Sequence, residues 1–428
     1  MKRIDLSQQP LKQQGQNAQA RLRTGGQSEP ESLVFGLAGH IIRKADREHP
    51  ADALLRHELM AQRRFAQDFK AQVSRAVLGY YRWRGWLDLT EPIPNQIKQA
   101  LELAEQFADR PASFSDQELM THAVPQWVRD QIEVAPAWVR AIQGEPKLWL
   151  RARPGQKSSL AEKLGIAQAA PAGCGQHALP DTMLYQGNED LFRRPEFHAG
   201  EFEIQDISSQ VVGLLCDPRP GETWWDACAG EGGKMLHLAD LMQNKGLVWA
   251  SDRAAWRLQR LRRRAARARV FNYRAALWDG GERPPTKTKF DGVLVDAPCS
   301  GIGTWQRNPH ARWTTTVEDV RELSEVQLRL LTNVAKSLKS LGKLVYAACT
   351  LTRAETVEVT ARVEKQLPEL SPLSLRNPLK PNEPSQNQLW LWPQDCGGNG
   401  IFVAASFGFL TQCERPRQPP LSGQFDRK

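Results

Sequence analysis

The stretch Gly-Val-Leu-Val-Asp-Ala-Pro-Cys-Ser-Gly at residues 292–301 decides the fold of this chain. It begins as a short apolar run of the kind that forms a buried strand, and it ends in a carboxylate, Asp296, and a thiol, Cys299, beside a turn. A second run, Lys-Leu-Val-Tyr-Ala-Ala at residues 343–348, ends in the same way at Cys349. Because the carboxyl ends of neighbouring parallel strands open onto one crevice, we expect the two thiols and the carboxylate to meet. This combination suits covalent chemistry on an electrophilic ring.

The second half of the chain alternates segments typical of strands with segments typical of helices. Further strands are expected at residues 223–226, 246–252 and 400–406, and helices at residues 234–242, 254–268 and 320–341. Repeated strand–helix units predict an α/β fold, in which a parallel sheet carries helices on both faces.

Length and spacing predict several domains, because 428 residues are too many for one ordinary core. Apolar residues at three- and four-residue spacing predict helices before residue 145, and Pro and Gly are frequent after it. The expected order is a disordered tail at 1–30, a helical domain at 31–145, a connecting α+β unit at 146–200, the α/β domain at 201–412 and a second disordered tail at 413–428. The first tail lacks the apolar centre of a secretory signal, and a mitochondrial transit peptide is the alternative reading.

Charge and cysteine content narrow the class of protein. The net charge of +9 favours a polyanionic partner, nucleic acid before a membrane surface, although a basic soluble enzyme is an equally good explanation. No apolar run approaches the roughly 20 residues of a membrane span. The seven cysteines show no metal-ligand spacing, so we expect no metal, no disulfide framework and a reducing cytoplasm. A monomer is expected.

A glycine-rich loop at residues 226–234, Asp-Ala-Cys-Ala-Gly-Glu-Gly-Gly-Lys, follows a predicted strand and opens a helix. Glycines there let the backbone approach a ligand closely. Asp252 ends the next strand, where an acid commonly accepts hydrogen bonds from ribose hydroxyls. The loop and the acid together predict a nucleoside-containing cofactor, and an ordinary tight turn is the alternative for the glycines alone.

The helix expected at 254–268 is crowded with arginine and holds almost no balancing acid. Such a helix repels itself unless phosphates or acids lie nearby, which favours an RNA surface, although a solvated face is an equally good explanation. A second surface of this kind, or a packed core, is expected around residues 82–86, Arg-Trp-Arg-Gly-Trp. The arginines of the first segment are Arg253, Arg257, Arg260, Arg262, Arg263, Arg264, Arg267 and Arg269.

Taken together, these motifs resemble those of the RNA (cytosine-5)-methyltransferases, with the bacterial RsmB (Sun/Fmu) type as the most similar branch. The resemblance covers residues 201–407 and rests on the loop at 226–234, the Asp-Ala-Pro-Cys-Ser-Gly motif and the strand that ends at Cys349. Residues 205–210 and 307–309 are similar to further family segments. The resemblance implies a Rossmann-like methyltransferase domain that uses S-adenosylmethionine (SAM), preceded by a NusB-like helical domain that binds RNA.

The resemblance also implies roles for individual residues. Cys349 would be the nucleophile that adds to cytosine C6, and Cys299 would assist release of the product. Asp296 would hydrogen-bond the base, and Lys234 would orient Asp296 or lower the pKa of a thiol electrostatically. The substrate would be RNA, and the expected target is ribosomal RNA of the 16S type. The residues expected to hold SAM are Cys228, Ala229, Gly230, Glu231, Gly232, Gly233, Lys234, Asp252, Asp279 and Asp296.

Three residues depart from the family pattern, and two other functions are considered. Glu231 stands where Pro is usual, His310 where an acid is usual, and Thr356 where Asn is usual. One rival function is a DNA cytosine-C5 methyltransferase, which uses the Pro-Cys thiol as nucleophile and has no counterpart of Cys349. The other is a catalytically silent RNA-binding or ribosome-assembly protein on the same fold. The intact pair of thiols, with Asp296 and Lys234, argues against both.

Overall fold

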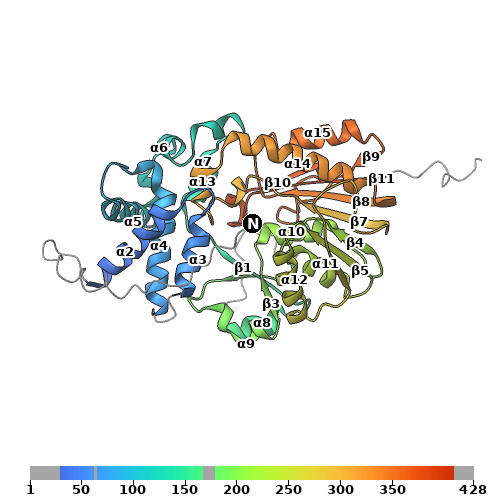
Figure 1. Ribbon diagram of the computed structural model, residues 1–428, viewed down its shortest axis with the longest axis horizontal. Helices are drawn as coiled ribbons and strands as arrows, with labels where there is room; N and C mark the ends of the chain where they lie inside the picture. Colours follow the sequence, from blue (N-terminus) through green and yellow to red (C-terminus); the bar gives the residue numbers. More distant parts are fainter. Residues whose placement is uncertain (1–28, 62–64, 167–178, 409–428) are drawn as a thin grey trace, which may run out of the picture.

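The computed structural model describes residues 29–61, 65–166 and 179–408 of the chain (Figure 1). The tails expected at 1–30 and 413–428 therefore lie almost entirely outside the described residues. Among the described residues, no helix is long and apolar enough to cross a membrane, and no group of three or more His, Cys, Asp or Glu side chains could hold a metal ion. Cys396 is disulfide-bonded, whereas the sequence predicts no disulfide framework.

The N-terminal part is all helical, as its spacing predicts. Pro94 lies in the first turn of α5, where its missing N–H costs no hydrogen bond. The helices are α2 (Glu29–Lys44), α3 (Ala51–Ala61), α4 (Gln67–Trp83), α5 (Ile93–Asp109), α6 (Asp116–His122) and α7 (Pro136–Gln143), with 3-10 turns at Arg84–Trp86, Pro111–Ser113 and Gln126–Asp130.

A small antiparallel sheet follows, between the helical part and the large sheet (Figure 1). Its order is β2-β1-β3, so β1 lies in the middle and pairs on both sides. Its third strand comes from beyond residue 200. The elements are β1 (Leu148–Ala152), α8 (Lys157–Leu164), β2 (Thr182–Tyr185), a 3-10 turn at Leu191–Arg193, α9 (Pro195–His198) and β3 (Phe202–Ile204).

The large sheet confirms the α/β fold. Its order is β10-β11-β8-β7-β4-β5-β6. The strands β4 to β8 pair in parallel, whereas β9, β10 and β11 form an antiparallel edge. The strands are β4 (Thr223–Asp226), β5 (Leu247–Asp252), β6 (Tyr273–Leu277), β7 (Phe290–Asp296), β8 (Leu338–Ala348), β9 (Leu370–Pro372), β10 (Gln388–Leu391) and β11 (Ile401–Gly408).

Helices cover both faces of this sheet because successive side chains of a strand point to opposite faces. On one face Leu294 packs into the core that α10, α11 and α12 cover, and on the other face Val293 packs into the core under α14 and α15. The expected helix at 320–341 ends earlier than expected, because residues 338–341 already belong to β8. The helices are α10 (Ile207–Cys216), α11 (Gly233–Leu241), α12 (Ala255–Arg267), α13 (Ala311–Thr314), α14 (Val317–Ala335), α15 (Val357–Gln366) and α16 (Pro393–Cys396), with a 3-10 turn at Ile302–Thr304.

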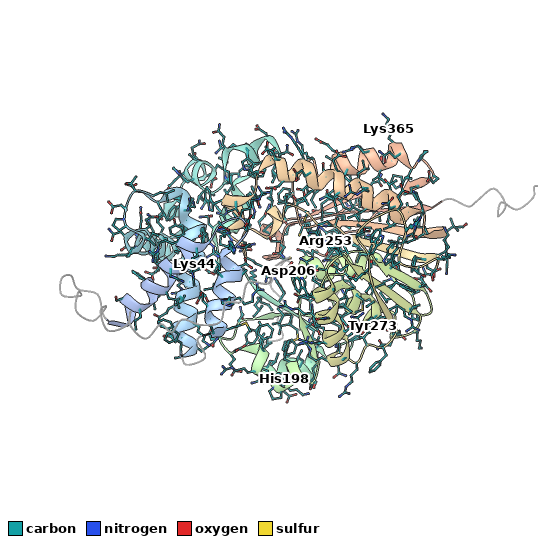
Figure 2. All side chains as sticks on the ribbon, viewed as in Figure 1. Lys44, His198, Asp206, Arg253, Tyr273 and Lys365 are labelled. Carbon is teal, nitrogen blue, oxygen red and sulfur yellow. The ribbon has the colours of Figure 1, made fainter. Side chains whose placement is uncertain are left out.

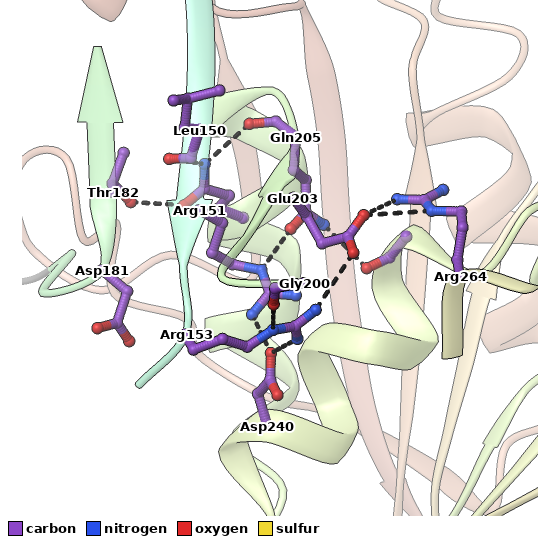
Figure 3. Close-up of polar contacts among 12 residues, drawn as sticks. Leu150, Arg151, Arg153, Asp181, Thr182, Gly200, Glu203, Gln205, Asp240 and Arg264 are labelled. Carbon is purple, nitrogen blue, oxygen red and sulfur yellow. Dashed lines mark hydrogen bonds and ion pairs between the residues drawn. The ribbon is translucent and has the colours of Figure 1, made fainter. Parts of the chain in front are cut away.

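Buried ion pairs join the small sheet to α11 and α12 (Figure 3). Glu203 of β3 is 2% exposed and pairs with Arg264 at 2.8 Å, Arg267 at 2.7 Å and Arg153 at 3.2 Å. Burial alone would raise the pKa of the Glu203 carboxyl, but the arginines outweigh burial and lower it. For Arg264 and Arg267 the nearby acid that such a helix needs is Glu203, so these two arginines serve the fold.

This network predicts a large stability effect at one residue. Glu203→Gln should lower the free energy of unfolding in urea at pH 7 by about 3 kcal/mol or more, because Arg264 and Arg267 lose their buried counter-charge and Arg153 keeps only Asp240. The folded-state pKa of Glu203 is lowered, so its contribution is present above about 4.5, the ordinary value, and is lost as the pH falls further. Glu201→Gln is the control, since its pair with Lys163 is more exposed and should contribute less than about 1 kcal/mol. Equal effects of the two substitutions would contradict this account.

Candidate active site

The parallel pairing of β7 with β8 brings the predicted thiols together. Asp296, the last residue of β7, is the register partner of Ala347 on β8. Cys299 follows the first strand by three residues and Cys349 follows the second directly. Their sulfur atoms lie 3.2 Å apart. The two turns after these strands therefore form one site.

A partly buried ion pair lies beside the thiols. Lys234, in the first turn of α11, donates from Nζ to Asp296 Oδ2 at 2.6 Å. Burial lowers the pKa of the Lys234 ammonium, but the Asp296 carboxylate outweighs burial and leaves that pKa raised. Lys234 is therefore a cation at neutral pH.

Cys299 differs from a reactive surface thiol. Its hydrogen bond to Cys349, then burial, raise the pKa of the Cys299 thiol well above the ordinary value. Cys299 therefore keeps its proton near neutral pH. A protonated thiol in contact with a second sulfur can hold or transfer a proton at that sulfur.

The glycine-rich loop connects β4 to α11 and is fixed by Asp252. Gly230 and Gly232 have φ of 53° and 87°, in the left-handed region that favours glycine. The Gly230 amide donates to Asp252 Oδ2 at 3.0 Å, and the Ala254 amide donates to the other oxygen at 2.8 Å. Glu231, the departure from the family pattern, pairs with Arg260 of α12 at 2.6 Å. Its extra charge is therefore balanced outside the loop.

A cavity with about 600 Å³ of empty space lies between this loop and the end of β7. Five of the residues expected to hold a cofactor line it: Cys228, Ala229, Gly233, Lys234 and Asp296. Asp252 lies behind the loop rather than in the lining. Asp279 is exposed, accepts a hydrogen bond from the Gly281 amide at 2.9 Å and is not brought to the cavity.

Asp226 also lines the cavity, and sequence reasoning assigned it no role. It is 0% exposed, and neither carboxylate oxygen has a hydrogen-bond partner among the described residues. Burial, and then the nearby Asp296, raise the pKa of Asp226 to about 7. A buried carboxylate without a partner is costly unless a ligand satisfies it. The position of Asp226 at the start of the loop was the available signal.

The segment at residues 307–310, part of which is similar to a family segment, makes most of its polar contacts within the protein. Arg307 binds Asp206 at 2.8 Å and Asn399 Oδ1 at 3.1 Å, and Asp206 lies between the helical part and the large sheet (Figure 2). His310 is 3% exposed and stacks edge-on against Tyr81, with ring centroids 4.6 Å apart. His310, where the family usually has an acid, therefore packs against α4 of the helical part. Thr356 is also buried and donates to the Thr352 carbonyl at 2.5 Å.

Comparison with known proteins agrees with this geometry. Residues 213–407 match the family of 16S rRNA methyltransferases RsmB/F. A ribosomal RNA small subunit methyltransferase B of Enterobacter sp. is 30% identical over 317 residues, which cover 72% of this chain and 70% of that relative. The chain belongs to the RsmB/F family. The family predicted from the sequence motifs is thereby confirmed.

Other members of the family match over shorter parts. A probable methyltransferase B of Synechocystis sp. is 31% identical, with 66% of this chain and 66% of the relative covered. One of Bacillus subtilis is 36% identical, with 49% of this chain and 48% of the relative covered. The matches thus span about half to two thirds of these relatives.

Solved structures support the fold. The crystal structure of PH0851 has a TM-score of 0.71 at 20% identity and covers 90% of this chain and all of its own chain. A methyltransferase homolog protein from Pyrococcus horikoshii has a TM-score of 0.51 at 27% identity and covers 64% of this chain and 90% of its own.

The contact between the thiols predicts their reactivity. At pH 8, Cys299 should react slowly with iodoacetamide, because its pKa is raised and the thiolate is the reactive form. Cys349→Ala removes the main cause, so the labelling rate of Cys299, followed by peptide mass spectrometry, should rise roughly tenfold. Cys216→Ala is the control, since Cys216 is buried in the core under α10, α11 and α12, whereas Cys299 packs against the core under α14 and α15; the rate should stay unchanged. An unchanged rate in Cys349→Ala would contradict the assigned hydrogen bond.

Proposed function

We propose that this chain methylates C5 of cytosine in RNA, with SAM as methyl donor and ribosomal small-subunit RNA as the substrate class. The observation that carries the proposal is the 3.2 Å contact between two thiols on neighbouring strand ends, beside the Lys234–Asp296 pair. The relatives named above as small-subunit methyltransferases support the choice of RNA.

The cavity suits SAM by charge. SAM carries an ammonium group and a sulfonium group, and the unpartnered carboxylate of Asp226 would be satisfied by a cation. The glycine-rich loop would approach the ligand through its backbone, and Asp252 would fix that loop or accept ribose hydroxyls. When bound, SAM supplies an electrophilic methyl group.

The thiols divide the chemistry at the base. The Cys349 thiolate attacks C6 and forms an S–C6 bond, so that electron density moves onto C5, which then takes the methyl group. Asp296, fixed by Lys234, would hydrogen-bond the base and stabilise the charge that develops. C5 of the cytosine then loses its proton to a general base. The S–C6 bond breaks, and Cys349 leaves as a thiolate. Cys299, in contact with that sulfur, would assist this last step.

The exposed face of α12 offers a surface for RNA. Trp256 is 52% exposed, and the guanidinium carbons of Arg257 and Arg260 lie 5.3 and 4.9 Å from its ring centroid. Arg262 and Arg263 are exposed and have no ion pair among the described residues. Aromatic rings flanked by arginine suit stacked bases and phosphates.

The division of labour gives a test with opposite outcomes for the two thiols. Cys299→Ala should methylate slowly or not at all and should accumulate a covalent protein–RNA complex, visible as a retarded band on a denaturing gel, because attack remains and release fails. Cys349→Ala and the double substitution should give neither product nor complex. A complex with Cys349→Ala but none with Cys299→Ala would reverse the roles and favour the DNA-methyltransferase-like mechanism.

The cofactor assignment is tested by two matched aspartates. Asp252→Asn should weaken SAM binding in calorimetry by roughly 1.5–3 kcal/mol, the scale of hydrogen bonds to a charged group. Asp279→Asn is the control, because this exposed carboxylate caps its own turn away from the cavity. If only Asp279→Asn weakened binding, the placement of SAM against the loop at 226–234 would be wrong.

A further inference from the structure

We infer that Glu355 is a positioning residue that holds the Cys299 turn against Cys349, a role that rests on the proposed function. Glu355 lies between β8 and α15 and is 0% exposed. It neither contacts the cavity nor belongs to the residues assigned a catalytic role. Its hydrogen bonds nevertheless reach the residues that directly follow both thiols.

The Glu355 carboxylate accepts hydrogen bonds from five donors. Oε1 accepts from the Ser300 amide at 2.8 Å and from Gln327 Nε2 at 3.0 Å. Oε2 accepts from the hydroxyls of Thr350 at 2.9 Å, Thr352 at 2.8 Å and Ser300. Ser300 follows Cys299 and Thr350 follows Cys349, so one buried carboxylate links the two turns.

These donors account for the burial of a charged group. No lysine or arginine forms an ion pair with Glu355 among the described residues. A buried carboxylate without a counter-ion is stable only when hydrogen bonds replace its hydration. The donors from the two turns stabilise the buried carboxylate. The same hydrogen bonds hold the two turns in place. Its charge also contributes, after Cys349 and burial, to the raised pKa of Cys299.

The two thiols depend on Glu355 to different extents. Cys349 follows β8, an 11-residue strand that pairs with β7 and β11, and its carbonyl accepts from the Gly303 amide at 3.1 Å. Cys299 lies in a loop after β7, held on one side by Ser300 and on the other by Gln327, which donates to the Pro298 carbonyl at 2.9 Å. Loss of Glu355 should therefore displace Cys299 and leave Cys349 in place.

A displaced Cys299 would slow release more than attack. Glu355→Gln keeps the shape of the side chain but replaces one acceptor oxygen by a donor amide that faces other donors. We expect steady-state methylation to fall roughly tenfold to a hundredfold, the scale of a small misplacement. SAM affinity should be unchanged, and part of the protein should accumulate as the covalent RNA complex. A merely structural role would lower activity without trapping a complex.

Two milder substitutions keep the test decisive if Glu355→Gln fails to fold. Ser300→Ala and Thr352→Val each remove one hydroxyl donor to Oε2, but only Ser300 adjoins Cys299. Ser300→Ala should trap detectable complex, and Thr352→Val should turn over without trapping. Equal behaviour of these two variants would overturn the role of Glu355, as would wild-type turnover of a folded Glu355→Gln protein. Cys299→Ala runs in parallel: if it traps nothing, the proposed chemistry itself is wrong, whatever Glu355 does.

Discussion

The parallel hydrogen-bonded pairing of β7 with β8 is the constraint on which the site depends. It places Asp296 opposite Ala347, and the turns that follow the two strands then have room for thiols 3.2 Å apart. Two further contacts are made to these strand ends. Lys234 of α11 donates to Asp296, and Glu355 accepts hydrogen bonds from Ser300 and Thr350 in the two turns.

The N-terminal helical part also supports these turns. Arg312, 0% exposed and 13 residues after Cys299 in the sequence, donates to the Ala123 carbonyl at 2.9 Å and to Gln143 Oε1 at 2.6 Å. After Cys349, the Arg353 amide donates to the Gln131 carbonyl at 3.0 Å. The segments that follow both thiols are thus anchored in the helical part of the chain.

The sequence predicts those features that follow from strand ends and local spacing. The convergence of Asp296, Cys299 and Cys349 is of this kind, because parallel strands share one open edge. Other features depend on side chains that the tertiary fold brings together, which the periodicity of the sequence does not reveal. They are the lack of hydrogen-bond partners for Asp226 and the five donors around Glu355. Asp279 shows the opposite kind of error. An acid shortly after β6 suggests a ligand-binding residue, but its carboxylate accepts a hydrogen bond from the Gly281 amide in its own turn. Glu203 likewise could not be matched to α12 from sequence alone.

The central claim is that Cys349, and not Cys299, attacks the base. It is tested most directly with the unaltered protein, SAM and small-subunit RNA in which cytosines are replaced by 5-azacytosine. Nitrogen at position 5 has no proton to lose, so the adduct persists and can be mapped after trypsin digestion. The account predicts RNA remnants on the peptide of residues 344–353, which contains Cys349. Remnants on residues 290–307, which contain Cys299, would contradict it.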